Sequence, residues 1–518
     1  MENINIRHEL NHYPNTSDYS STQVVLPLDC GILIEQSDPV ISFNQIMDEI
    51  NLKVFVKRYT KGRHDYEEIT LIKILLFAYM NQITSLRKIE EACRNDIRFI
   101  WLSQGIRPSH MTFYRLIKER LKGRFEDLFY EINEVLVRKD QIDTSVLYID
   151  GTKFEANATK NSFVWKKAVL KNQKKLFEKI SAFYRTYSLE TKRSYHSDDL
   201  SEFKMALYND CLLKKIEFVS GKGHHKPPLQ KAYETIRDYQ DKLKEYEEHL
   251  SICGERNSYS KTDHDATFMH MKEDYYMRTG IFKPGYNVQL GVSDEYIMMA
   301  KTYPNPTDTK TFIPFLEAHK KAYGFYPKTP VADAGYGSYD NYLYCVTRGM
   351  ELYQKYSLYE QEKHGVKKKQ KFQSKSMRQE DGSFVCPEGK SFNYVDSHLD
   401  EKGLYPKLIH HYQCVDCTDC PIAKDCKKSE TNRHLSINPV LIELQSIAKE
   451  NLDSARGIQL RMNRSAQSES TFGILKYNWG KQRFTRRGQE NVDNELYLLC
   501  IGYNLMKYHS RKLRRNLS

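Results

Sequence analysis

Three acidic residues that lie far apart in the chain place the strongest constraint on its fold. Asp150 lies in the segment YIDGTKF, Asp333 in PVADAGYGS and Glu469 in SESTFGILK. We expect the first two at the ends of buried strands and the third at the start of a helix, where the three carboxylates can converge. Converging carboxylates suit two divalent cations, which prefer hard oxygen ligands and support in-line phosphodiester chemistry. The pattern therefore indicates an enzyme that acts on DNA.

The composition agrees with this interpretation without establishing it. The 518 residues, 40% of them hydrophobic, suffice for roughly two to four domains with their own cores. Lys and Arg total 79 against 67 Asp and Glu, and the net charge of +12 suits a polyanionic partner. Charge alone leaves nucleic-acid binding open, because many basic proteins bind no polyanion.

No segment of the sequence is expected to enter a membrane. The chain begins with the polar run MENINI, and its apolar stretches are too short for a spanning helix. We therefore expect a cytoplasmic protein with no membrane partner. Its 11 Cys should then be thiols or metal ligands rather than disulfides.

The N-terminal part divides into an irregular segment, residues 1–42, and a helical domain, residues 43–140. Ser109 is a good N-cap for a helix that begins at His110 and turns Arg115 and Lys118 outward. This helix could be the last helix of a helix-turn-helix that enters a DNA groove. An ordinary helical bundle with a solvated basic face fits the same pattern, and the pattern leaves both readings open.

The order of elements between the insertions indicates an α/β fold. A strand ends at Asp150, and Asp333 ends a later strand that neighbours it. The predicted order is strand, strand, strand, helix, strand, helix, strand, a mixed sheet covered by helices that is typical of a ribonuclease-H-like core. Residues 141–160 and 280–360 form the first parts of this core, and residues 446–518 add the Glu469 helix and a basic tail.

Residues 161–279 read as a long helical insertion. Val169, Leu176 and Phe183 repeat at a seven-residue step, and the stretch from Tyr233 to Leu250 alternates steps of three and four. Such stripes suit a two-helix arm. The arm could clamp DNA, or it could be a solvent-exposed insertion with no direct role.

Residues 361–445 form a Cys-rich insertion. Five thiols lie in this segment, three of them separated by gaps of two residues: Cys386, Cys414, Cys417, Cys420 and Cys426. Such spacing lets successive thiolates face one tetrahedral zinc ion, and a closed Cys site is structural rather than catalytic. An iron–sulfur cluster fits less well, because the gap before the last Cys is five residues rather than three. The other six Cys suit buried core positions.

Taken together, these segments resemble the DDE transposases of bacterial insertion sequences. The resemblance rests on YIDGTKFEANA, KPGYNVQ, VADAGYGS and RMNRSAQSE followed by FGILK, and it extends from about residue 40 to the C-terminus. The most similar group is the branch named insertion sequence eleven-eighty-two. One departure is the spacing between Arg464 and Glu469, which has four intervening residues where related transposases often have three.

The resemblance implies a ribonuclease-H-like core that uses two Mg²⁺ or Mn²⁺ ions held by Asp150, Asp333 and Glu469. It implies that the partner is double-stranded DNA, both terminal inverted repeats and target, in a bacterial enzyme associated with the nucleoid. Pairing of two DNA ends makes a homodimer plausible in the DNA complex. Within the Cys-rich segment the resemblance favours four zinc ligands, Cys386, Cys417, Cys420 and Cys426, and leaves Cys414 as the spare.

Basic residues around Glu469 are candidates for DNA contact. Phosphate contacts are expected from Arg464 and from a basic run that has Trp479 among its members: Lys476, Lys481, Arg483, Arg486 and Arg487. A solvated basic flank is the alternative for the run. The predicted function is cleavage of the transposon end followed by joining to target DNA, two phosphoryl transfers that depend on positioning. Two other functions remain open, an inactive DNA-binding relic and a nuclease without strand transfer.

Overall fold

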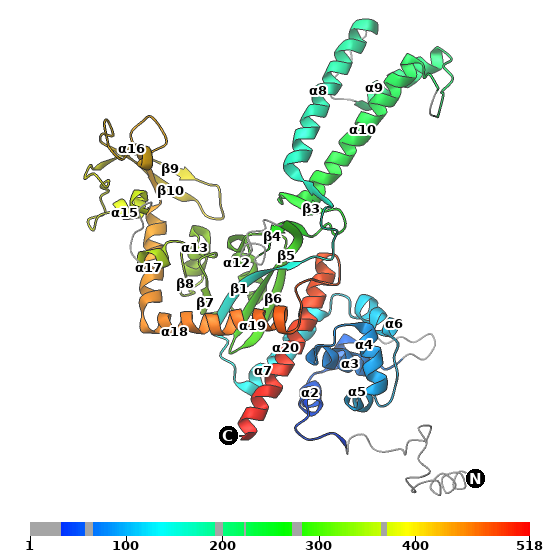
Figure 1. The fold of residues 1–518 in the computed structure, drawn as a ribbon, viewed down its shortest axis with the longest axis vertical. Helices are drawn as coiled ribbons and strands as arrows, with labels where there is room; N and C mark the ends of the chain where they lie inside the picture. The colour runs from blue at the N-terminus through cyan, green and yellow to red at the C-terminus, as the bar shows by residue number, and fades with distance from the viewer. Residues whose placement is uncertain are drawn as a thin grey trace. The chain divides into compact units, whose positions relative to one another are not determined.

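The computed structural model describes residues 33–56, 66–191, 200–221, 224–271, 282–363 and 370–517. The chain forms two compact units, one of residues 1–140 and 501–518 and the other of residues 141–500 (Figure 1). The predicted irregular segment lies mostly outside the described residues. Among those residues, no helix is long and apolar enough to cross a membrane.

The first unit is helical around α3, which is buried almost all round. Its apolar core includes Leu75, Phe77, Phe99, Phe113 and Phe129. Ser109 caps α6 as predicted, since its hydroxyl accepts from Thr112 N at 3.4 Å. The elements are α2 (Pro39–Met47), η3 (Leu52–Phe55), α3 (Glu68–Met80), α4 (Leu86–Asn95), α5 (Ile97–Leu102), α6 (His110–Arg115), the π-helical η4 (Leu116–Arg120) and α7 (Phe125–Asp140).

The end of helix α20 (Gln489–Leu517) groups with this unit, although the sequence led us to expect the tail with the core. Asn504 donates to Asn133 Oδ1 at 2.9 Å, deep in the unit. Arg515 Nη2 lies 2.8 Å from Asp140 Oδ1, whose side chain is fully buried. The basic tail therefore has a structural use here.

The second unit contains the predicted mixed sheet, which is confirmed. Strand order is β4-β5-β1-β7-β8, with β6 also paired to β5. β1 runs antiparallel to β5 and parallel to β7, and β7 runs parallel to β8. The strands are β1 (Val146–Glu155), β4 (Thr267–His270), β5 (Phe282–Ser293), β6 (Tyr296–Tyr303), β7 (Thr329–Ala332) and β8 (Tyr353–Gln354).

Helices connect the strands in the predicted order. The element η5 (Asp308–Lys310) leads into α12 (Phe312–Tyr323), and α13 (Tyr339–Thr347) separates β7 from β8. After β8 comes the short α14 (Tyr359–Lys363). The start of η5 lies close to the middle of β1, at Gly151, and to the segment after β7, at Gly335.

The helix that carries Glu469 is longer than predicted. It begins at Ala455, where the Ser454 hydroxyl accepts from Gly457 N at 3.0 Å, so Glu469 lies well inside it and not at its start. The helical run comprises α18 (Ala455–Arg464), the π-helical η7 (Ser465–Glu469), α19 (Ser470–Gly473) and the π-helical η8 (Ile474–Asn478), and it follows α17 (Pro439–Asp453).

The arm has a third helix that the sequence did not reveal. Its helices are α8 (Lys166–Thr191), α9 (Leu200–Leu213) and α10 (Pro228–Cys253), and the short strands β2 (Phe163–Trp165) and β3 (Ser258–Ser260) pair at its base. Figure 1 shows α8 and α10 side by side. A buried stripe of Leu176, Ile180, Phe203 and Ile236 holds the three helices together.

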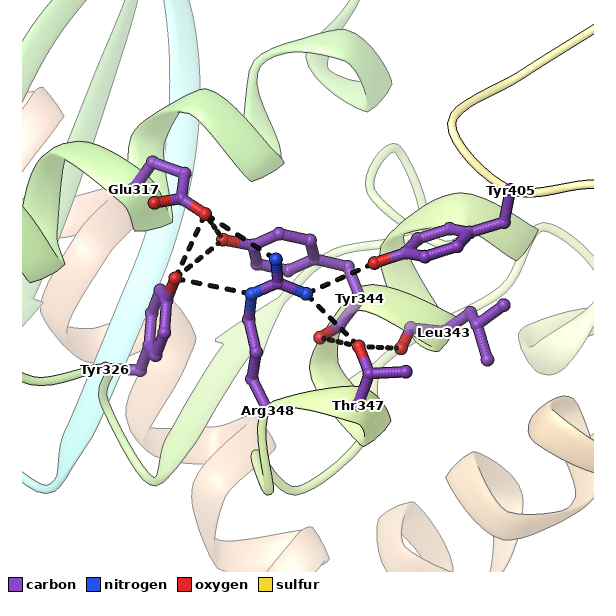
Figure 2. Close-up of polar contacts among 7 residues, drawn as sticks. All are labelled: Glu317, Tyr326, Leu343, Tyr344, Thr347, Arg348 and Tyr405. Atoms are coloured by element: carbon purple, nitrogen blue, oxygen red, sulfur yellow. Dashed lines mark hydrogen bonds and ion pairs between the residues drawn. The ribbon is translucent and has the colours of Figure 1, made fainter.

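The Cys-rich segment folds around a three-stranded antiparallel sheet, β11-β10-β9. The tip of the β9–β10 hairpin contacts α13: Arg348 stacks 3.7 Å above the Tyr344 ring and donates to the Tyr405 hydroxyl at 3.1 Å (Figure 2). The elements are η6 (Gln370–Phe372), α15 (Ser374–Met377), β9 (Phe392–Asp400), β10 (Lys407–Cys414), α16 (Ala423–Cys426) and β11 (His434–Ile437).

Candidate active site

Asp150 and Asp333 occupy matching positions on neighbouring parallel strands. Tyr148 pairs with Val331, so each Asp lies two residues beyond a paired position. Asp333 directly follows β7, as predicted. Asp150 does not end its strand, because β1 continues to Glu155 while it remains paired with β5. The side chain of Asp150 is largely buried, and the residue as a whole is 7% exposed.

A fourth carboxylate, Asp308, lies beside these two, and sequence reasoning missed it. Asn287 and Gln289 of β5 donate to Asp308 Oδ1 at 2.7 and 2.9 Å. Both amides are buried, at 1% and 0% exposed, in a strand that is otherwise apolar inside. Polar residues at a two-residue step in a buried strand were the available signal, since a buried amide needs a partner.

Two glycines allow the backbone to pack closely around Asp308. A Cβ on Gly335 would lie 3.0 Å from Asp333 Oδ1 and 3.6 Å from Asp308 Oδ2. A Cβ on Gly151 would lie 2.8 Å from Asp308 Oδ1 and would also meet the Gln289 amide. Any side chain at either position would therefore crowd the carboxylates.

Tyr336 lies in the negative electrostatic environment of these carboxylates. Its hydroxyl donates to Gln289 Oε1, and the residue is fully buried. Burial, and then the negative charges of Asp308, Asp150 and Asp333, holds the pKa of Tyr336 well above its ordinary value. Tyr336 is therefore a neutral hydrogen-bond donor next to three carboxylates.

Arg464 joins Glu469 to Asp150. Arg464 Nη2 lies 3.0 Å from Glu469 Oε1, and Nη1 lies 3.7 Å from Asp150 Oδ1. The two residues are five apart, a separation that would turn them away from each other on an α-helix. The π-helical turn of η7 takes up the additional residue and aligns them. Glu469 itself is more open than Asp150, with 54% of its side chain exposed.

The other predicted DNA-contacting residues fall into two groups. Lys476 is 5% exposed and donates to Lys153 O at 2.8 Å, and Lys481 lies 3.8 Å from Glu495 Oε1, with its pKa lowered by burial. These two ammonium groups contact the protein itself, as do Arg483 and Arg487, which donate to Ala156 O at 3.2 Å and to Asn157 O at 2.7 Å. The more accessible residues are Arg483 and Arg487, which are exposed, Arg486, which is half-buried, and Arg115 and Lys118, which are exposed in the helical unit.

The donor chemistry of the site fits Mg²⁺ or Mn²⁺, because carboxylate oxygens are the ligands that such hard cations prefer. Asp150, Asp333, Asp308 and Glu469 supply only oxygen. In the part of the chain that the structure describes, however, no three His, Cys, Asp or Glu side chains lie close enough together to hold a metal ion.

The clustered Cys lie near one another without forming such a group either. Cys386 Sγ accepts from Lys390 N at 3.3 Å, and Cys417 Sγ accepts from Arg433 N at 3.4 Å. Cys414 is 2% exposed, and burial, then the Cys417 and Cys386 thiols, raises its pKa to about 11. Cys420 and Cys426 are only partly buried, as are Cys386 and Cys417.

Comparisons with known proteins give two family matches. Residues 385–509 match the model of a transposase DDE domain, and residues 29–119 match the model of a transposase domain called DUF772. The first match includes Glu469 and the Cys pattern, while Asp150 and Asp333 lie outside it. No curated protein and no solved structure matches the chain. The two matches support a DDE transposase of insertion sequences, an enzyme type that acts on DNA.

Proposed function

We propose that this protein is a DNA transposase that cleaves the ends of an insertion sequence and joins them to target DNA. The observation that supports the proposal is that Asp150 of β1 and Asp333 after β7 lie at matching positions of paired strands, and that Arg464 lies between Asp150 and Glu469 of η7. The order and directions of the sheet's strands support a ribonuclease-H-like core.

The chain's own residues would hold and orient the reactants. Asp150, Asp333 and Glu469 would bind Mg²⁺ or Mn²⁺, which when bound supplies an activated nucleophile and stabilises the leaving oxygen. Asn287 and Gln289 fix Asp308, and the neutral Tyr336 fixes Gln289. The exposed Gly335 leaves room for a DNA phosphate to approach Asp333, and Gly151 allows close packing against Asp308. Catalysis of this kind rests on positioning and charge stabilisation.

The DNA would be double-stranded, first the terminal inverted repeat and then the bacterial target. Arg483, Arg486 and Arg487 flank the Glu469 helix and are more accessible for phosphate contact than Lys476 and Lys481, whose side chains are more buried. Arg115 and Lys118 would contact DNA from the helical unit. A homodimer would let one complex hold both transposon ends.

We also propose a structural zinc site at Cys386, Cys417, Cys420 and Cys426. Backbone N–H groups donate to Cys386 Sγ and Cys417 Sγ, a hydrogen bond that the sulfur of a zinc ligand can also accept. Burial of Cys414 supports leaving it out. Metal analysis tests the assignment: Cys420→Ser should lose zinc while Cys414→Ser keeps it, and equal zinc content in both variants would contradict it.

Cleavage and joining of a labelled duplex that carries the terminal repeat test the proposed function. With Mg²⁺ or Mn²⁺, the wild type should cut at the repeat and join the new 3′ end. Asp150→Asn, Asp333→Asn and Glu469→Gln should each abolish both steps while DNA binding persists. The control Asp238→Asn, on the exposed face of α10, should leave cleavage and joining intact. Binding without cleavage by the wild type would indicate a DNA-binding relic, and cleavage without joining a nuclease.

A further inference from the structure

The long helix α8 of the arm differs in charge from the helices it packs against. It carries seven Lys or Arg and two Glu, whereas α10 carries four Lys or Arg and six Asp or Glu. The two helices have the same length and lie side by side. The basic charge of the arm is therefore concentrated on one helix.

The basic residues of α8 occupy a single solvent-facing side. Six of them are exposed, Lys167, Lys171, Lys174, Lys175, Lys179 and Arg185, at steps that keep them within about 140° of one another on an α-helix. The opposite side is buried against α9 and α10 through Val169, Leu176, Ile180 and Tyr184. We call the six residues the α8 basic face.

The charges of the α8 basic face are not used within the described part of the chain. Its members form no ion pair with a carboxylate there, in contrast to Lys226 elsewhere in the arm, which pairs with Glu234 at 2.7 Å. Six like charges on one helix face repel one another and lower helix stability. A helix that keeps them without internal partners is suited to an external polyanion.

We propose that the α8 basic face binds the phosphate backbone of double-stranded DNA. The inference rests on the proposed function and adds to it a second contact surface, in a part of the chain that neither family match includes. From Lys167 to Arg185 the face is roughly 27 Å long, from the helical rise of about 1.5 Å per residue. That length corresponds to about eight base pairs of DNA.

The contact is to phosphates and not to bases. The face consists of long, flexible cations without the Asn, Gln or bidentate Arg pattern that reads base edges, apart from Arg185 near its end. Binding should therefore be independent of sequence and strongly dependent on salt, because each neutralised phosphate releases counterions. Such a surface would hold flanking or target DNA while the carboxylate site acts on the transposon end.

One acidic residue offers a change in the opposite direction. Glu178 lies within the α8 basic face by its helical position and is exposed. Its negative charge opposes phosphate binding at the centre of the face. Replacing Glu178 by Gln should therefore strengthen DNA binding, an effect that general damage to the arm could not produce.

Fluorescence anisotropy with a duplex that lacks the terminal repeat tests the proposal on the full chain. The variant Lys171→Gln, Lys174→Gln, Lys175→Gln should bind on the order of tenfold more weakly, and its slope of log affinity against log salt should fall by about 2 to 3. Gln keeps the helix propensity of Lys, so the arm should stay folded. E178Q should bind several-fold more tightly.

A matched variant on α10 removes the same charge elsewhere. Lys231, Lys242 and Lys244 are exposed, and their replacement by Gln should leave the salt slope unchanged. Equal losses in the two triple variants, or an unchanged slope in the α8 variant, would overturn the proposal. So would a dimer, measured by sedimentation without DNA, that the α8 changes dissociate, since the acidic α10 of a second copy would then be the occupant.

The assay separates this proposal from the proposed function, because binding to this duplex needs no cleavage. If the α8 variant loses DNA affinity but the wild type never cuts a terminal repeat, the DNA-binding surface stands and the transposase activity falls. If the wild type cuts and joins while the α8 variant binds as the wild type does, the reverse holds.

Discussion

The carboxylate site around Asp150, Asp333, Asp308 and Glu469 and the α8 basic face both carry many charges, but the charges have different surroundings. At the sheet edge, Asp308 has two amide donors and Arg464 lies between Asp150 and Glu469. On α8, six exposed cations have no carboxylate partner among the described residues. The carboxylate site therefore depends on exact geometry, whereas the α8 basic face depends on the summed attraction of its cations for phosphate. Single changes should therefore be severe in the first region and mild in the second.

After the substitutions of Asp150, Asp333 and Glu469, the largest effect is expected from Asp308→Asn. The Asn287 and Gln289 amides donate to one carboxylate oxygen; Asn would keep an oxygen there to accept from them but would replace the other oxygen with a donor and remove the negative charge. We expect cleavage to fall by about 10²-fold, the cost of losing one preorganised polar group in an active site. Cleavage rates of the purified variant give the measurement, with Asp238→Asn as the control for the same chemical change on an exposed helix.

Unchanged cleavage by Asp308→Asn would show that Asp308 is not part of the site and that the site tolerates changes in its geometry. Circular dichroism must show that the variant is folded, because an unpaired buried amide also costs about 1–3 kcal/mol of stability. We expect a variant that is folded but inactive.

Gly151→Ala should be next in size, and its effect is on stability. The added methyl group would meet Asp308 Oδ1 at 2.8 Å and the Tyr336 hydroxyl at 2.9 Å, both in a buried network. Overpacking of this kind costs about 1–3 kcal/mol. Denaturant unfolding measures it, with Gly473→Ala as the control: nothing lies within 4 Å of that position in α19, so alanine should stabilise the helix by up to about 1 kcal/mol. Equal stability of the two variants would show that the sheet edge is looser than its contacts indicate.

The sequence predicted the parts of this region that follow from local periodicity. The strands around Asp150 and Asp333 are apolar runs with clear ends on one side, and neighbouring parallel strands bring such positions together. The end of β1 was misplaced because Asp150-Gly151 reads as a turn, whereas pairing with β5 carries the strand on to Glu155. Long-range pairing overrode a local turn signal.

Other features depend on contacts that no local pattern contains. Asp308 follows two prolines at the start of a helical segment, where an acidic residue is expected for capping alone. The π-helical turn that aligns Arg464 with Glu469 has no sequence signature in an otherwise ordinary helix. The docking of the α20 end on the helical unit also escaped prediction, since its basic residues looked like an unattached tail.

A smaller effect is expected from Arg464→Gln, and it concerns metal affinity. The Arg464 guanidinium neutralises Asp150 and Glu469, the residues proposed to bind the cations. Removing one positive charge at this distance should favour a divalent cation by about 1 kcal/mol or more even at high dielectric, or on the order of fivefold in affinity. Mn²⁺ titration followed by electron paramagnetic resonance measures it without any need for turnover. Weaker Mn²⁺ binding would mean instead that Arg464 holds the carboxylates in place for the metal.

The smallest effect is expected from replacing single lysines of α8. Loss of one phosphate contact, as in Lys174→Gln, should lower the salt slope by about 0.9 and weaken DNA binding only a few-fold. Because these side chains share no partner, the effects of Lys171→Gln and Lys174→Gln should add, whereas Arg464 and Glu469 share an ion pair and their substitutions should not. Anisotropy on the two single variants and the double variant gives the coupling energy. A coupling energy well above about 0.5 kcal/mol on α8 would show that Lys171 and Lys174 bind the same phosphate together. The α8 basic face would then be a defined phosphate site and not a set of independent contacts.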